Sequence, residues 1–138
     1  QALIDLLIQK ARPYIYTTAM PPGLACATLA SLQLLRQADR QRDQLQAHIL
    51  QMRQGLQKLG LPSFASETPI QSVILQSSER ALALAAFLRQ QGIWVQVMRP
   101  PTVRERHACC RIVLTAAHKS EDITLLLEGI AQWQEVTS

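Results

Sequence analysis

Arg111 is the residue of this 138-residue sequence that is best suited to chemistry, because it stands directly before the apolar, strand-like run 112–114. An arginine is seldom placed in a buried strand without a partner, since its charge is costly to remove from water. Its planar guanidinium matches a carboxylate in two parallel hydrogen bonds. We therefore predict that Arg111 binds the acid group of a substrate. A structural ion pair with an Asp or Glu, or an edge-strand position that reaches water, stays open as an alternative.

Thr17 and Thr18 form a second candidate site, in a segment that reads as extended over residues 14–20 and precedes Pro21-Pro22. Proline is tolerated in the first turn of a helix, so a new helix is expected to begin there. Hydroxyls and free backbone amides at such a position can hold an anion, for example a phosphate. A Thr-Thr pair by itself does not specify such a site, so from the residues alone Thr17 and Thr18 are only candidates for it.

The remaining cysteines and histidines do not form a convincing site. Cys109 and Cys110 are adjacent in a strand-like stretch, where successive side chains point to opposite faces, so together with His107 they are poorly placed to converge on a metal. Buried, reduced thiols are expected instead. His118 is interpreted as a local hydrogen-bonding residue and His48 as a surface residue. No catalytic residue and no metal site are predicted in this chain.

The elements that must position these residues are visible in the hydrophobic pattern. Residues 2–10 and 23–35 are predicted helices that are apolar around most of their circumference, which calls for burial on several sides by a neighbour that this short chain does not offer. Polar residues 36–44 mark a bend or a break. Residues 45–59 then form an amphipathic helix that ends at Gly60.

The C-terminal half is expected to be a compact α/β unit in the order strand, helix, strand, strand, helix. The boundaries predicted for these elements are residues 72–76, 79–91, 94–98, 110–114 and 121–133. Ser120 is the expected N-cap of the last helix, because its hydroxyl can accept a hydrogen bond from a backbone amide of the first turn. The fold class is therefore α/β with a three-stranded sheet, preceded by a long helical segment.

Composition narrows the functional classes. A chain with 48% hydrophobic residues can bury one core without disulfides or metals, and no apolar run approaches the length of a membrane span. We expect a cytoplasmic protein with no membrane contact. The net charge of +4 allows nucleic-acid binding, but 4% aromatic residues leave little for bases to stack on, so no nucleic-acid partner is predicted.

Several segments, in the same order along nearly the whole chain, resemble the α-oxoamine synthase family, which consists of pyridoxal-phosphate enzymes of fold type I. The segments are residues 12–22, 79–84, 98–103 and 111–118, and they include the runs Arg-Pro-Pro-Thr-Val and Leu-Thr-Ala-Ala-His. The resemblance implies the fold of aspartate aminotransferase, assembled as a homodimer. Residues 1–59 would be the tail of the large domain with long connecting helices, and residues 60–138 would be the small C-terminal α/β domain.

The resemblance also implies a reaction. It is closest to the branch of the family that condenses L-alanine with pimeloyl-CoA, or with a pimeloyl-carrier protein, and releases carbon dioxide in biotin biosynthesis. In that reaction pyridoxal 5'-phosphate acts as the electron sink. By position, Arg111 matches the family arginine that holds the amino-acid carboxylate. Thr17 and Thr18 match the hydroxyl pair beside the cofactor phosphate, apparently that of the neighbouring subunit.

The sequence departs from the family pattern in three places. Residues 103–106 are Val-Arg-Glu-Arg where the family usually has Val-Pro-x-Gly, and Cys109 stands where an arginine is common. The family's Ser-Lys segment, which carries the lysine that binds the cofactor, has no counterpart at Lys10, Lys58 or Lys119. The chain alone is therefore expected to be inactive and to need the missing large domain. A free-standing α/β ligand-binding or regulatory module is the alternative.

Overall fold

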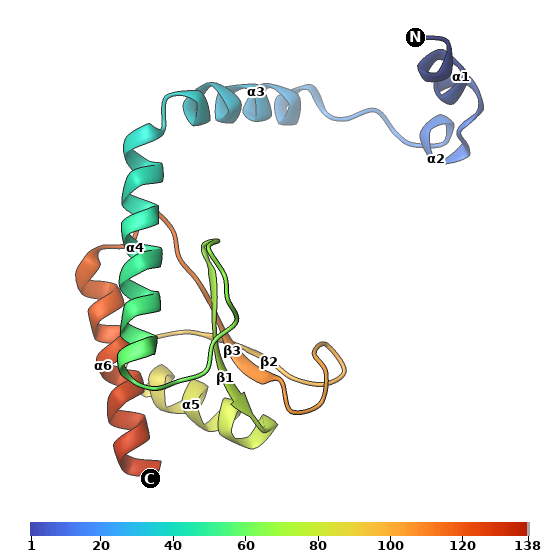
Figure 1. Cartoon of the computed structure of the whole chain (residues 1–138). Coiled ribbons are helices and arrows are strands. Elements are labelled where there is room, and N and C mark those ends of the chain that lie inside the picture. The colour runs from blue at the N-terminus through green and yellow to red at the C-terminus, as the bar shows by residue number, and fades with distance from the viewer. Residues whose placement is uncertain (138) are drawn as a thin grey trace. The chain divides into compact units, whose positions relative to one another are not determined.

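A computed structural model describes residues 1–137 of the chain (Figure 1). The chain divides into two compact units, which are described separately. The N-terminal unit is Gln1–Ala38, and the C-terminal unit begins at Asp39. Within residues 1–137, no helix has both the length and the apolar character that crossing a membrane requires.

The N-terminal unit consists of three helices, α1 (Ala2–Lys10), α2 (Arg12–Ile15) and α3 (Pro22–Arg36). Helices α1 and α3 confirm the predicted helices, but the extended segment predicted from residue 14 is wrong at its start. Tyr14 and Ile15 belong to α2, because Pro13 occupies the first turn of that short helix, where its missing amide hydrogen costs nothing. None of the residues of these three helices is buried.

The C-terminal unit confirms the predicted order of elements. It contains α4 (Asp39–Lys58), β1 (Ile70–Gln76), α5 (Ser78–Gln90), β2 (Gln96–Met98), β3 (Ala108–Val113) and α6 (Ser120–Thr137). The fold class predicted from the sequence, an α/β unit with a three-stranded sheet, is confirmed. The break before α4 is shorter than residues 36–44, since only Gln37 and Ala38 separate α3 from α4.

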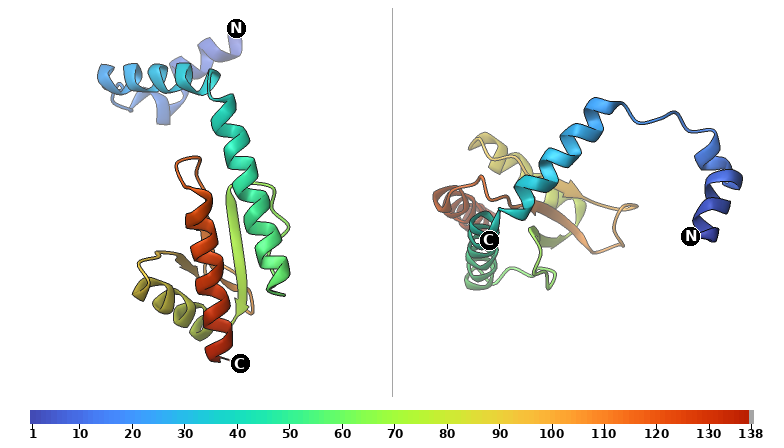
Figure 2. Two further views of the ribbon diagram at one scale, coloured as in Figure 1. Left: turned by 90° about the vertical axis from the view of Figure 1, so that its left-hand side faces the viewer. Right: turned by 90° about the horizontal axis from the view of Figure 1, so that it is seen from above.

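The sheet is antiparallel with the strand order β1-β3-β2, so β3 lies at its centre. Helices α4, α5 and α6 pack together on one face of the sheet (Figure 2). The side chains of Val73, Cys110 and Ile112 point into the core that forms between that face and the helices. Each of the helices α4, α5 and α6 adds apolar side chains to this core, namely Ile49, Met52, Leu56, Ala81, Leu84, Leu88, Ile123, Leu126, Ile130 and Trp133.

His48 is buried rather than at the surface, so the expectation for this residue is wrong. Its position on α4 places it on the same face as Ile49 and Met52, and its side chain is 4% exposed. The ring nitrogen Nδ1 donates a hydrogen bond to the carbonyl oxygen of Thr115 at 3.2 Å. His48 thereby ties α4 to the turn that follows β3.

Local chemistry explains the end of α4 and the beginning of α5, whereas the beginning of α6 differs from the prediction. Gly60 ends the turn after α4 in the left-handed conformation, with φ 66°, as predicted. Ser77 caps α5 by accepting a hydrogen bond from the amide of Arg80 at 3.2 Å. Ser120, predicted as the N-cap of α6, is the first helical residue instead, and its hydroxyl donates to Gln51 of α4 at 2.9 Å.

Candidate functional site

Arg111 lies in the middle of the sheet. It is the register partner of Ser72 in β1 and of Gln96 in β2, so a strand flanks it on each side. Its neighbours Cys110 and Ile112 face the helices. Because side chains alternate along a strand, Arg111 faces the side of the sheet that the helices leave uncovered.

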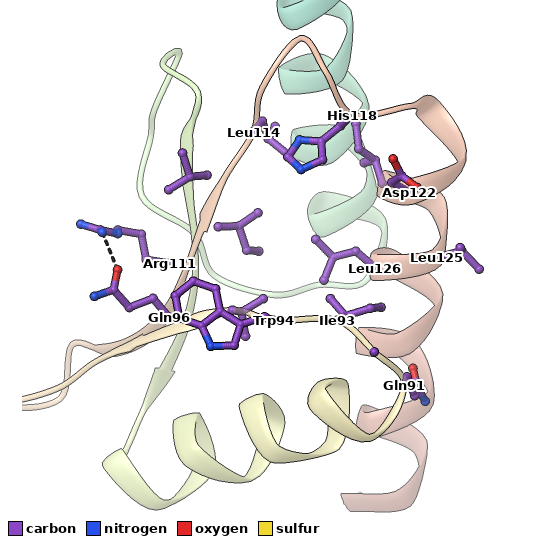
Figure 3. A pocket seen from close by; sticks show the side chains of 15 residues that line it. Gln91, Ile93, Trp94, Gln96, Arg111, Leu114, His118, Asp122, Leu125 and Leu126 are labelled. Atoms are coloured by element: carbon purple, nitrogen blue, oxygen red, sulfur yellow. Dashed lines mark hydrogen bonds between the residues drawn. The ribbon is translucent and has the colours of Figure 1, made fainter.

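The guanidinium of Arg111 is only partly satisfied. One terminal nitrogen donates a hydrogen bond to the amide oxygen of Gln96 (Figure 3). Its Nε is the one buried side-chain nitrogen or oxygen in residues 1–137 that has no hydrogen-bond partner. In the same residues, the ion pair that the structure contains joins Arg42 to Asp39, so no carboxylate neutralises Arg111. Within the described residues, Arg111 therefore does not form the structural ion pair that was the alternative to substrate binding.

A hollow of about 710 Å³ borders this arginine at the edge of the sheet. Its lining includes Arg111 and Gln96, the 70% exposed Trp94, and His118 and Asp122 at the beginning of α6. In Figure 3 the side chains of Arg111 and Gln96 project together, on the opposite side of the strands from His118 and Asp122. An unneutralised, half-buried guanidinium in this position attracts a small carboxylate, which could pair with its terminal nitrogens.

The turn between β3 and α6 is built from the Thr-Ala-Ala-His run of the sequence. His118 Nδ1 accepts a hydrogen bond from the amide of Thr115 at 3.0 Å, which confirms the predicted local role of His118. The carbonyl of Thr115 accepts the bond from His48 described above. Both histidines thus hold this turn in place, and neither is free for proton transfer through Nδ1.

Cys109 and Cys110 are free and buried, as predicted, and their side chains lie on opposite faces of β3. Cys110 donates a weak hydrogen bond from Sγ to the carbonyl of Ala81 at 3.4 Å, and burial raises the pKa of its thiol to about 12. Burial also raises the pKa of Cys109, which the nearby charge of Arg111 partly offsets. No group of three or more metal-ligating side chains gathers among residues 1–137.

Thr17 and Thr18 line a separate hollow within the N-terminal unit, together with Tyr14 and Met20. The hydroxyl of Thr17 donates to the carbonyl of Pro13, so it would have to rotate before it could donate to a phosphate. The structure records no hydrogen bond for the exposed side chain of Thr18. The hollow thus offers two hydroxyl groups that can donate to an anion, and that of Thr18 needs no rearrangement.

Two functional features were missed by reasoning from the sequence. Gln96 was not singled out, although its amide oxygen holds the guanidinium of Arg111. Its position in the alternating pattern of β2 could have placed it beside Arg111 only if the pairing of the strands had been known. His48 was assigned to the surface, although its spacing of four residues from Met52 places it on the apolar side of its helix.

The sequence model for aminotransferases of class I and II matches residues 1–130. The chain belongs to this family. Among its relatives, 8-amino-7-oxononanoate synthase of Stutzerimonas stutzeri is 52% identical over 132 residues, which cover 96% of the chain and 34% of that protein. The enzyme of the same name from Pseudomonas putida is 49% identical, with the same coverage. The chain thus spans about a third of the length of these class I and II relatives.

Solved structures agree with this assignment to the class I and II aminotransferases. The crystal structure of 8-amino-7-oxononanoate synthase from Francisella tularensis matches with a TM-score of 0.83 and 31% identity, over 99% of this chain and 40% of that one. Serine palmitoyltransferase of Sphingomonas wittichii matches with a TM-score of 0.88 and 26% identity, over 97% of this chain and 34% of that one. The family depends on pyridoxal phosphate. The resemblance found in the sequence is confirmed.

Proposed function

We propose that this chain is the C-terminal part of a pyridoxal-phosphate-dependent acyltransferase that makes 8-amino-7-oxononanoate in biotin biosynthesis. The substrates in this proposal are L-alanine and a pimeloyl thioester, with release of carbon dioxide. The identity of 52% to a relative of that name supports it. The observation that carries it is the guanidinium of Arg111, which has a buried, unpartnered Nε and no carboxylate beside it.

Arg111 would bind the carboxylate of L-alanine. A carboxylate held by a fixed guanidinium cannot rotate freely, so the orientation of the bonds at the α-carbon is set before reaction. Gln96 would act as a positioning residue, because its amide oxygen restrains the guanidinium. The bound cofactor would supply an electron sink for the carbanion.

Thr17 and Thr18 would hold the cofactor phosphate through their hydroxyls, in a site shared with the neighbouring subunit of a homodimer. The lysine that binds the cofactor would come from the part of the protein that precedes this chain. In this proposal residues 1–59 belong to the large domain and its connecting helices, and residues 60–138 form the small domain. The chain alone would be inactive, and the whole enzyme would be a cytoplasmic homodimer.

The proposal is tested on the whole protein that contains this chain, supplied with pyridoxal phosphate. We expect alanine-dependent release of carbon dioxide and of coenzyme A from pimeloyl-CoA, or of free thiol from a pimeloyl-carrier protein. L-Serine with palmitoyl-CoA is the matched comparison, because a serine palmitoyltransferase has a similar structure. No release from L-alanine with either pimeloyl donor, or a preference for L-serine and palmitoyl-CoA, would contradict the proposal.

A further inference from the structure

The loop that joins β2 to β3, residues 99–107, carries an excess of positive charge that no ion pair within residues 1–137 neutralises. It contains Arg99, Arg104 and Arg106, with Glu105 as its single acidic residue. All three arginines are exposed, and none of them takes part in the ion pair found in residues 1–137. In Figure 1 and in the right-hand view of Figure 2 this orange loop projects away from the helices and the sheet.

The loop contains backbone hydrogen bonds of its own and one ring contact to the segment before β1. The amide of Thr102 donates to the carbonyl of Arg99 at 2.9 Å, and the amide of His107 donates to the carbonyl of Arg104 at 3.1 Å. The ring of His107 lies parallel to that of Phe64, with centroids 6.3 Å apart. The arginines are therefore presented from an ordered support, so less conformational entropy is lost when a partner binds.

Arg106 occupies a backbone conformation that does not favour arginine. Its φ is 61°, in the left-handed region that glycine adopts without steric penalty. An arginine thus stands on a backbone conformation that is typical of glycine. A side chain placed against the local backbone preference indicates a role for that side chain.

The shape of the loop indicates what kind of anion it meets. A small phosphorylated ligand is normally held in a concave site. The hollows that border Arg111 and the Thr17–Thr18 pair have no lining residue from 99–107. A projecting, positively charged loop instead suits a broad surface of opposite charge on another macromolecule, where it speeds encounter and fixes orientation.

We propose that the β2–β3 loop docks an acidic protein surface, namely that of the carrier protein which delivers the acyl thioester. This inference rests on the proposed function. In this inference Arg104 and Arg106 contact the surface of the carrier protein and not the arm that bears the thioester. Arg111 lies three residues beyond the start of β3, about 10 Å along the strand. A carrier bound at the loop would therefore stand close to the face of the sheet where Arg111 binds the amino acid.

The test measures binding before it measures turnover. In the whole protein, the double variant Arg104→Gln/Arg106→Gly removes two charges and places glycine at the left-handed position, so the backbone of the loop is not strained. We expect its Kd for the carrier protein without the phosphopantetheine arm to rise about tenfold at low salt, and the salt dependence of binding to weaken. The variant Arg53→Gln/Arg89→Gln removes the same charge from exposed positions on α4 and α5, and should bind as the unmodified protein does.

Turnover then separates the possible outcomes. The double loop variant should raise the KM for pimeloyl-carrier protein about tenfold, with the KM for pimeloyl-CoA changed less than twofold. An equal rise in the KM for pimeloyl-CoA would show that the loop binds the phosphate groups of a small donor. That result would contradict the proposed docking surface. Unchanged carrier binding would overturn it as well. If the protein turns over neither donor but binds the carrier through the loop, the proposed function fails and the docking surface stands.

Discussion

A guanidinium in the middle of a sheet needs partners for its charge and for its N–H groups, and Arg111 finds only part of them within the chain. Gln96 satisfies one nitrogen, and Nε stays without a partner. A neutral amide oxygen restrains the guanidinium but does not neutralise it. The position is thus prepared for a carboxylate from outside, which is the chemistry predicted for Arg111 from its place in an apolar strand.

The fold makes the thiol of the buried Cys110 unreactive. Because burial raises the pKa of Cys110 to about 12, almost none of its reactive thiolate exists at pH 8. We expect iodoacetamide to label Cys110 at least tenfold more slowly than the exposed Cys26 in the 138-residue chain, as read by peptide mass spectrometry. Adding urea should bring the two rates together. Equal rates without denaturant would show that the strand opens readily.

The raised pKa of Cys110 also makes the stability of the fold depend on pH. The folded-state pKa of Cys110 lies above the ordinary value of 9.0, so the folded state holds this proton more tightly than the unfolded state. Its contribution to stability is present below about pH 9 and is lost as the pH rises toward 12. The Cys110→Ala variant should therefore lose less of its stability over this interval than the unmodified chain.

At the scale of elements, the sequence predicted every helix and strand of the C-terminal unit in order, because the periodicity of residues 45–59 and the glycines at 60 and 92 are local signals. Boundaries were less well predicted, as the sheet extends β1 back to Ile70 by pairing it with Val113. The pairing of β3 between β1 and β2 depends on distant contacts. The environment of Arg111 could therefore not be derived from local pattern.

The contact between α5 and α6 offers a sharp test at this scale. A methyl group at Gly129 would lie 2.7 Å from Oε1 of Gln91 and 2.9 Å from Cδ2 of the fully buried Leu88, so these side chains would have to shift. Gly129→Ala should thus lower the free energy of local opening of α5 and α6 by about 1–3 kcal/mol. Hydrogen exchange of the backbone amides of these helices in the whole protein measures this change.

Gly23→Ala provides a control outside the C-terminal unit, and within residues 1–137 a methyl group there meets nothing within 4 Å. It should leave exchange in α5 and α6 unchanged, because Gly23 belongs to the N-terminal unit. Unchanged exchange in Gly129→Ala would mean that the two helices are less tightly packed than the structure shows.

At the scale of the whole molecule, the apolar surfaces of α1 and α3 are the dominant feature. The sequence predicted that these helices need cover on several sides, and within the N-terminal unit the leucines stay open, with Leu29 62% and Leu34 71% exposed. Monomeric proteins rarely expose contiguous apolar patches of this kind. The chain spans about a third of its curated relatives, so the proposed large domain is the natural cover.

A double substitution on α3, made both in the whole protein and in the isolated chain, tests whether the large domain covers this helix. In the whole protein, Leu29→Gln/Leu34→Gln should lower the melting temperature by several degrees, because burying each leucine contributes about 1.5–3 kcal/mol. In the isolated 138-residue chain the same pair should reduce self-association, as measured by light scattering. Arg53→Gln, at an exposed position of α4, is the control. A whole protein that tolerates both changes without loss would show that α3 is not covered.

The central claim, that Arg111 binds the amino-acid carboxylate, is tested most directly by steady-state kinetics of Arg111→Gln in the whole enzyme. Losing a charge-assisted hydrogen-bond pair of about 2–3 kcal/mol predicts a rise in the KM for L-alanine of the order of 100-fold. The KM for the pimeloyl donor should change less than threefold, Arg111→Lys should recover part of the loss, and Arg89→Gln should have no effect. An unchanged KM for L-alanine in Arg111→Gln would contradict the account.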